Sequence, residues 1–154
     1  MPDTLYDQDI LAWSEQQADL IRRLVASDQL GNSVDWSNVA EEIEAVGRTE
    51  LRTCETLLRQ AMTHLLKLHV WPDSRFAAEW REEAAICLDD AQNRFSPSMR
   101  QKIDLERLYA RVVQRTIAVA DNMSLPNLAA ARCPFELDQL LDGNIKTLIA
   151  RLGT

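Results

Sequence analysis

The residues with the greatest capacity for metal chemistry are two histidines, His64 and His69. A helical zinc site places its histidines four residues apart on one face, whereas these two are five residues apart and fall on different faces. A di-iron bundle needs Glu-x-x-His motifs, but Ala61 and Leu66 stand three residues before the two histidines. We therefore expect no metal site.

The cysteines and glycines do not form a recognised catalytic or cofactor motif. Cys54 and His64 lie ten residues apart on one predicted helix, which is about 15 Å along its axis and too far for a nucleophile–base pair. The four glycines are scattered, so there is no glycine-rich phosphate loop and no G-x-S-x-G motif. We predict no catalytic residues and no cofactor, and we do not expect an enzyme. The odd cysteine count indicates free thiols in a reducing compartment, at Cys54, Cys87 and Cys133.

A polar cluster near the start of the long helix is the first candidate for a binding site. Glu41 and Glu44 lie near the positive end of the helix dipole, where carboxylates are stabilised. Glu44 also stands four residues before Arg48, the favourable spacing for an ion pair, and Glu55–Arg59 repeats this spacing. A solvated, dipole-compensating face is the plain interpretation. The alternative is a polar or partner-binding site formed by Glu41, Glu44, Arg48 and His64.

His64 is the second candidate, because it lies on the apolar stripe of its helix and is expected near Trp80 of the next helix. A half-buried histidine can act as a pH-sensitive group or a proton donor. It can also be a packed side chain whose ring nitrogen meets a carboxylate or water. We favour the packed histidine.

A row of arginines on the fourth predicted helix is the third candidate. Its members lie mostly on one face: Arg100, Arg107, Arg111 and Arg115. Such a row can hold an anionic partner. It can also pair with acids of the preceding helix, namely Glu79, Glu82 and Glu83. In an acidic chain we favour internal pairing.

One long amphipathic helix over Asp35–Trp71 must position most of these residues. Its apolar side chains return every three or four positions, as on one face of a 3.6-residue helix. At 1.5 Å per residue this helix would be roughly 50 Å long. Gly47 costs about 1 kcal/mol relative to alanine inside a helix, so we expect it to mark a close helix–helix contact or a mild kink rather than a functional hinge. Leu57, Leu58, Met62 and Leu65 are expected to be mainly buried.

Three further helices and a short tail complete the predicted architecture. The first is capped by Asp7, and Ser96 with Pro97 gives a start signal for the fourth. The predicted spans are Gln8–Ala26, Arg75–Arg94, Pro97–Asn122, a short helix over Glu136–Leu141 ended by Gly143, and a last turn or two in IKTLIARL. The fold class is therefore all-α, an up-and-down helical bundle of four principal helices with a short helical C-terminal tail. Short connections make successive helices antiparallel.

Composition limits the classes of function. With 154 residues and 46% hydrophobic content, residues 1–154 suit a single helical-bundle domain. A net charge of −7 disfavours binding to nucleic acid and to anionic membranes. The N-terminal segment lacks the basic and apolar regions of a signal peptide, and no apolar run approaches the roughly 20 residues of a membrane span. We expect a cytoplasmic location.

Three segments, spread over nearly the whole chain, resemble a known bacterial family, the domain of unknown function numbered 29. Tyr6-Asp7 with Trp13 is similar to the family's opening Y-D-x-D-x-x-x-W. The second segment is Trp36–Arg48 (WSNVAEEIEAVGR), followed by His64-Leu65-Leu66-Lys67. The third is Cys133-Pro134-Phe135 with Leu137–Asp142 (LDQLLD). The resemblance implies an all-helical up-and-down bundle and no activity. The chain departs from the family between Leu125 and Arg132, where the family carries more acid.

Two hypotheses for function follow. The leading one is a cytosolic helical module for protein–protein interaction, for example an acidic, antitoxin-like neutralising partner of a basic protein. The N-terminal half of the long helix, around Val39, Ile43 and Val46, is expected to lack a cover from the third helix. If the first helix does not cover it, a second copy or another protein should dock there, with Gly47 allowing close approach, and we favour a homodimer over a monomer. The alternative is a small-molecule-binding or enzymatic bundle, with a pocket near His64, Trp80 and the Glu41–Arg48 region.

Overall fold

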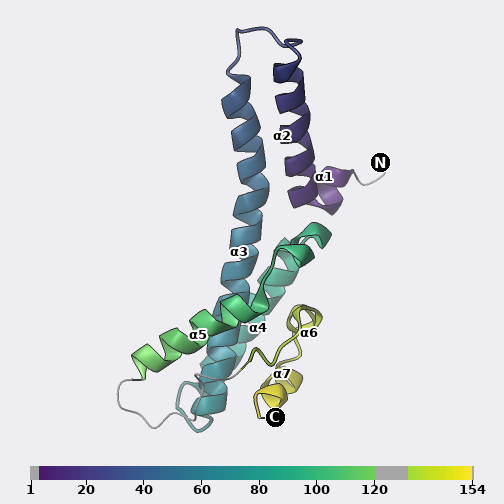
Figure 1. The fold of residues 1–154 in the computed structure, drawn as a ribbon. Helices are drawn as coiled ribbons and strands as arrows, with labels where there is room; N and C mark the ends of the chain where they lie inside the picture. Colours follow the sequence, from purple (N-terminus) through teal and green to yellow (C-terminus); the bar gives the residue numbers. More distant parts are fainter. Residues whose placement is uncertain (1–3, 121–131, 154) are drawn as a thin grey trace. The chain divides into compact units, whose positions relative to one another are not determined.

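The computed structural model describes residues 4–120 and 132–153, and this part of the chain consists of helices and connecting loops without a strand (Figure 1). The helices are α1 (Leu5–Gln8), α2 (Ile10–Ala26), α3 (Trp36–Val70), α4 (Ala77–Arg94), the 3-10 helix η1 (Pro97–Gln101), α5 (Leu105–Val119), α6 (Leu137–Asp142) and α7 (Ile145–Leu152). The prediction of an all-α bundle with four principal helices and a helical C-terminal tail is confirmed. None of the described helices combines the length and apolar composition needed to cross a bilayer.

The chain forms two compact units, and the long helix α3 contributes to both. The first unit comprises Met1–Thr53 and Arg94–Lys102, and the second comprises Cys54–Asn93 and Ile103–Thr154. That residues 1–154 behave as a single domain stays a prediction.

Helix α3 begins and ends where the sequence indicates. The Asp35 carboxylate accepts hydrogen bonds from the Asn38 backbone N–H (3.2 Å) and the Asn38 side-chain amide (2.6 Å), which satisfies one free donor of the first turn. Pro72 lacks an N–H and disfavours helical geometry in the residue before it, so α3 stops at Val70. The predicted span of the long helix is confirmed to within one residue at each end.

The predicted start of the first helix is wrong, because Asp7 and Asp9 stabilise the starts of two different helices. Asp7 accepts hydrogen bonds from the Thr4 hydroxyl (2.7 Å) and the Thr4 backbone N–H (3.1 Å), which closes the single turn α1. Asp9 then caps α2, accepting from the Ala12 N–H at 3.0 Å. The continuous helix from Gln8 is therefore replaced by two helices with a break at Asp9.

The predicted start of the fourth helix is also wrong. Ser96 and Pro97 begin the 3-10 helix η1, and α5 begins only after Asp104, which accepts from the Arg107 N–H at 3.1 Å. Asp104 provides a second capping side chain, and a cap starts a new helix rather than extending the old one. The predicted end at Asn122 lies outside the described residues.

Within the first unit, α2 packs on α3 at Gly47. A methyl group added at Gly47 would overlap the Ser14 hydroxyl and lie 3.1 Å from the Leu11 Cα. Ser14 is fully buried and donates its hydroxyl to the Leu11 carbonyl at 2.9 Å. The close helix–helix contact predicted for Gly47 is confirmed, and its partner is α2 of the same chain.

Within the second unit, α3 and α4 run antiparallel, and their facing side chains form the core. The Cys54 thiol donates to the Ala91 carbonyl at 3.6 Å, and His64 meets Glu83. The fully buried large side chains of this unit include Leu58, Met62, Leu65, Leu66, Leu88, Leu140 and Leu148. Leu58, Met62 and Leu65 are fully buried and Leu57 is partly exposed, so these four residues are mainly buried as expected.

We predict that Gly47→Ala destabilises the fold, although alanine favours an isolated helix by about 1 kcal/mol. The added methyl group overpacks the α2–α3 contact, and such overpacking typically costs about 1–3 kcal/mol. Urea denaturation should show a lower midpoint for Gly47→Ala. Gly31→Ala is the matched control, because nothing lies within 4 Å of the added methyl group. Equal midpoints for the two variants would contradict the close packing.

Leu58→Ala should lower the free energy of unfolding by about 2–5 kcal/mol, since it leaves a cavity in the second unit. Leu57→Ala removes the same atoms from a half-buried position one residue away. It should cost clearly less in the same guanidinium titration. The assignment of the buried face fails if Leu57→Ala is the more damaging change.

Candidate functional site

Glu41, Glu44 and Arg48 come together in the first unit, joined by Arg22 from α2. Arg22 contacts Glu44 at 2.8 Å and Glu41 at 3.4 Å, while Arg48 contacts Glu41 at 2.6 Å and Glu44 at 3.4 Å. The hydrogen bond from Arg22 lowers the pKa of the Glu44 carboxyl. Sequence spacing within α3 predicts the Glu44–Arg48 pair, but it carries no signal for Arg22, which belongs to another helix.

This four-residue network joins α2 to α3 and leaves little charge for a ligand. Two arginines balance two carboxylates, and ion pairs as exposed as these contribute little stability individually. The cluster therefore serves as an alignment device between the two helices.

A shallow apolar groove on one side of α3 is the second feature of the first unit. Its lining residues come from the first turns of α3 and the residue before it: Asp35, Asn38, Val39, Glu42, Ile43 and Val46. The Val46 side chain is 45% exposed, so α2 covers a different side of α3. The groove coincides with the stripe predicted to lack an intrachain cover.

His64 belongs to the second unit and is a packed histidine. Its Nε2 lies 3.0 Å from Glu83 Oε2, and its Nδ1 is buried without a hydrogen-bond partner among the described residues. Burial lowers the pKa of His64 below its usual 6.5, and Lys67 adds to this, against the opposing effects of Glu83 and Glu79. The lowered pKa leaves the imidazole neutral at neutral pH, so the contact with Glu83 is not an ion pair there, and the favoured interpretation of His64 as a packed side chain agrees with this geometry.

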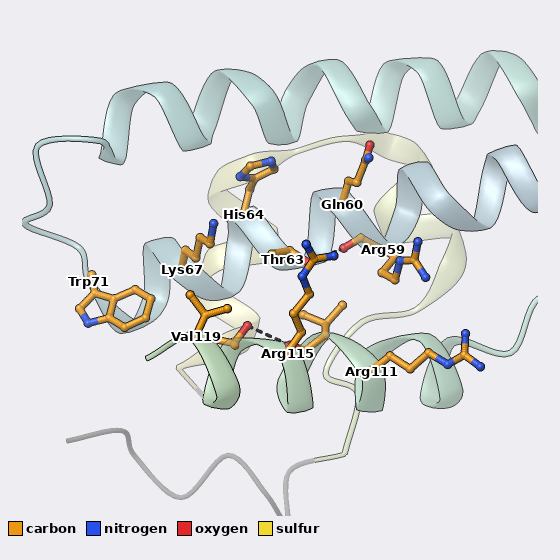
Figure 2. A pocket seen from close by; sticks show the side chains of 11 residues that line it. Arg59, Gln60, Thr63, His64, Lys67, Trp71, Arg111, Arg115 and Val119 are labelled. Carbon is orange, nitrogen blue, oxygen red and sulfur yellow. Dashed lines mark hydrogen bonds between the residues drawn. The ribbon is translucent and has the colours of Figure 1, made fainter. Parts of the chain in front are cut away.

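The predicted candidate residues are divided between the two compact units. Glu41, Glu44 and Arg48 lie in the first compact unit, whereas His64 and Trp80 lie in the second. His64 instead lines a pocket of about 390 Å³ between α3 and α5. Figure 2 shows this pocket, whose lining side chains are Arg59, Gln60, Thr63, His64, Lys67, Trp71, Arg111, Val112, Arg115, Thr116 and Val119.

Two members of the arginine row, Arg111 and Arg115, do not form the internal pairs that we favoured. Within residues 4–120 and 132–153, neither Arg111 nor Arg115 has an ion pair with Glu79, Glu82 or Glu83. Both arginines line the pocket instead, and Arg115 extends from α5 toward α3 (Figure 2). The rotation of α4 and α5 about their axes decides this outcome, and a single sequence does not specify that rotation.

Arg59 is a pocket residue that the sequence analysis missed. Its spacing from Glu55 predicts an ion pair along the helix, but the described structure has none and Arg59 lines the pocket. One signal for Arg59 was available in the sequence, because it follows the buried Leu58. A residue beside a buried apolar stripe lies close to the neighbouring helix.

The thiols have the character of core or shielded groups. Cys54 is fully buried, and burial raises the pKa of both the Cys87 and Cys133 thiols. A raised pKa keeps a thiol protonated and weakly nucleophilic. The described residues contain no group of three or more histidine, cysteine, aspartate or glutamate side chains arranged to hold a metal ion.

Comparison with known proteins identifies a family without an assigned activity. The family described as "Domain of unknown function DUF29" matches residues 5–145, so the chain belongs to this family. A crystal structure of an alpha-helical protein of unknown function from Rhodospirillum rubrum is similar over 99% of both chains, with 29% sequence identity and a TM-score of 0.86. No curated protein matches the sequence.

The lowered pKa of His64 predicts a pH-dependent stability. In the unfolded chain the imidazole titrates near 6.5, and in the folded chain it titrates lower. Between these two values the unfolded state binds more protons, so the free energy of unfolding falls as the pH drops below about 6.5. Above that value the imidazole is neutral in both states and this loss disappears.

His64→Gln should remove this part of the pH dependence while keeping a donor for Glu83. Denaturant unfolding of both proteins from about pH 8 to pH 5 measures the effect. The wild type should lose more stability than the variant over this range. Parallel curves for the two proteins would contradict the assignment of a neutral, buried imidazole.

Proposed function

We propose that this member of the DUF29 family is a protein-interaction module that docks a partner on the Val39–Ile43–Val46 face of α3. The observation that carries the proposal is the apolar groove on this face, which the helices of the first unit leave open. Exposed apolar grooves with polar rims are typical of interaction sites.

The charge at the rim favours a basic partner over a second copy. Asp35 and Glu42 border the groove, and the whole chain has a net charge of −7. Two copies meeting through this face would bring like charges together, which disfavours self-association. A partner helix with apolar side chains flanked by lysine or arginine matches both the groove and its rim.

One concrete form of this function is the neutralisation of a basic protein in the bacterial cytoplasm. The free thiols of the described cysteines fit a reducing compartment. The acidic surface would accelerate the encounter with a basic protein, and the apolar groove would supply the stable contact.

Gly47 does not serve the partner directly. The sequence left open that this glycine lets a second copy approach α3 closely. Its free side is occupied by Ser14 and Leu11 of the same chain, so the docking face depends on the valines and Ile43 instead.

We predict that Val46→Glu abolishes partner capture. The change places a carboxylate in the apolar groove, and Val46 is exposed enough for the free protein to remain folded. Affinity capture from a lysate of the source cells should retain a basic protein on wild type and lose it on Val46→Glu, by roughly tenfold or more. Ile86→Glu is the matched control, because Ile86 is 53% exposed and belongs to the other unit.

Sedimentation separates the two kinds of partner. A wild-type monomer at tens of micromolar, combined with capture of a basic protein, supports the proposal. A wild-type dimer that Val46→Glu converts to a monomer would make the partner a second copy. Equal capture by wild type and Val46→Glu, with circular dichroism showing both folded, would reject this face as the docking site.

A further inference from the structure

The pocket between α3 and α5 gathers positive charge in an acidic protein. Four of its eleven lining side chains are cationic: Arg59, Lys67, Arg111 and Arg115. None of the eleven is a carboxylate, although the chain has 24 acidic residues against 17 basic ones. A solvated helix face in such a chain would be expected to mix acids with its bases.

The charges of these four side chains are not neutralised within the described structure. None of the four forms an ion pair with a residue in 4–120 or 132–153, in contrast to Arg22 and Arg48. Lys67 lies over the Trp80 ring, 5.6 Å from its centroid, and such a contact leaves the charge in place. Cations that share a pocket repel one another, and an anion bound among them relieves this repulsion.

A second, more apolar pocket adjoins the first. It has a volume of about 640 Å³ and shares Lys67, Trp71 and Val119 with the cationic pocket. Its aromatic wall is formed by Trp71 and Trp80, whose ring centroids are 6.5 Å apart. The two pockets together present a cationic end, which also offers the Gln60 and Thr63 side chains, and an aromatic end.

We propose that these adjoining pockets bind a nucleotide-type ligand, a phosphorylated small molecule with a flat aromatic ring. Phosphate oxygens would be held by Arg59, Arg111 and Arg115, because guanidinium groups match phosphate geometry with paired N–H donors. The aromatic ring would pack on Trp71. A site for several negative charges suits a phosphate or diphosphate better than a single carboxylate. This proposal does not depend on the docking face of the first unit.

His64 completes the polar wall without adding charge. The groups that face it are Glu83 and Glu79 from α4 and Lys67 from its own helix. Its Nε2 lies 3.0 Å from Glu83 Oε2, and Glu83 is not among the residues that line the pocket.

The test is calorimetric titration of the full chain with ADP, pyrophosphate, adenosine and citrate as probes. ADP should bind one to one with a Kd below about 1 mM, more tightly than any other probe. Citrate carries similar negative charge without phosphate, so equal affinity for citrate would overturn the phosphate assignment. Equal affinity for ADP and pyrophosphate would overturn the assignment of an aromatic ring packed on Trp71. No saturable binding of ADP or pyrophosphate at several millimolar would overturn the whole proposal.

Arginine variants locate the binding site. Arg115→Gln should weaken ADP and pyrophosphate by roughly tenfold or more, since a charge-assisted contact is lost. Arg107→Gln removes the same charge from an exposed position of the same helix, α5, outside the pocket. This change should have little effect on the affinity for ADP and pyrophosphate. Equal losses in the two variants would show a general charge effect and reject the pocket.

Trp71→Leu should weaken ADP several-fold and leave pyrophosphate unchanged, which no purely structural role of Trp71 would produce. If any variant fails to fold, amide chemical shifts of the wild-type protein locate the bound ligand instead. Addition of ADP should shift the signals of Gln60, Thr63 and Arg115. Shifts confined to other residues would place the ligand elsewhere and reject the proposal.

Discussion

The structure depends on covering one apolar stripe along the 35-residue helix α3. An isolated helix draws little stability from its own hydrogen bonds, so α3 relies on tertiary packing along its length. In the first unit α2 supplies this packing at Ala40 and Gly47, and in the second unit α4 supplies it at Cys54. This packing leaves apolar side chains of α3 open in the first unit and a cationic pocket beside α5 open in the second.

The two surfaces differ in how their charges are satisfied. In the first unit, Arg22 and Arg48 are matched by Glu41 and Glu44, so the open surface beside them is defined by apolar side chains. In the second unit, Arg111 and Arg115 lack such partners among the described residues, so the open surface there is defined by charge. Matched surface charges align helices and contribute little energy, whereas unmatched ones in a pocket gain energy from an anion. This difference is the physical reason for assigning a protein partner to one unit and a small anion to the other.

The features that the sequence predicts correctly are those with a single local cause. The bounds of α3 follow from Asp35 and Pro72, and the end of α6 follows from Gly143, whose φ of 71° suits glycine. The break at Asp9 has a local cause, its cap to the Ala12 N–H, and a distant one. Its carboxylate accepts hydrogen bonds from the Ser98 N–H (2.7 Å) and hydroxyl (2.6 Å), 89 residues away. Desolvation of Asp9 acts to raise its pKa, yet these bonds and the cap to Ala12 together lower it.

The residues of the candidate sites show the same difference between local and distant causes. The pairing of Glu44 with Arg48 is set by spacing within one helix, and it is present. The contacts of Arg22 and the positions of Arg59 and Arg115 in the pocket depend on how one helix is rotated against another. Residue spacing within a helix does not predict this rotation. The relative from Rhodospirillum rubrum keeps the fold at 29% identity, so most positions can differ without loss of this fold.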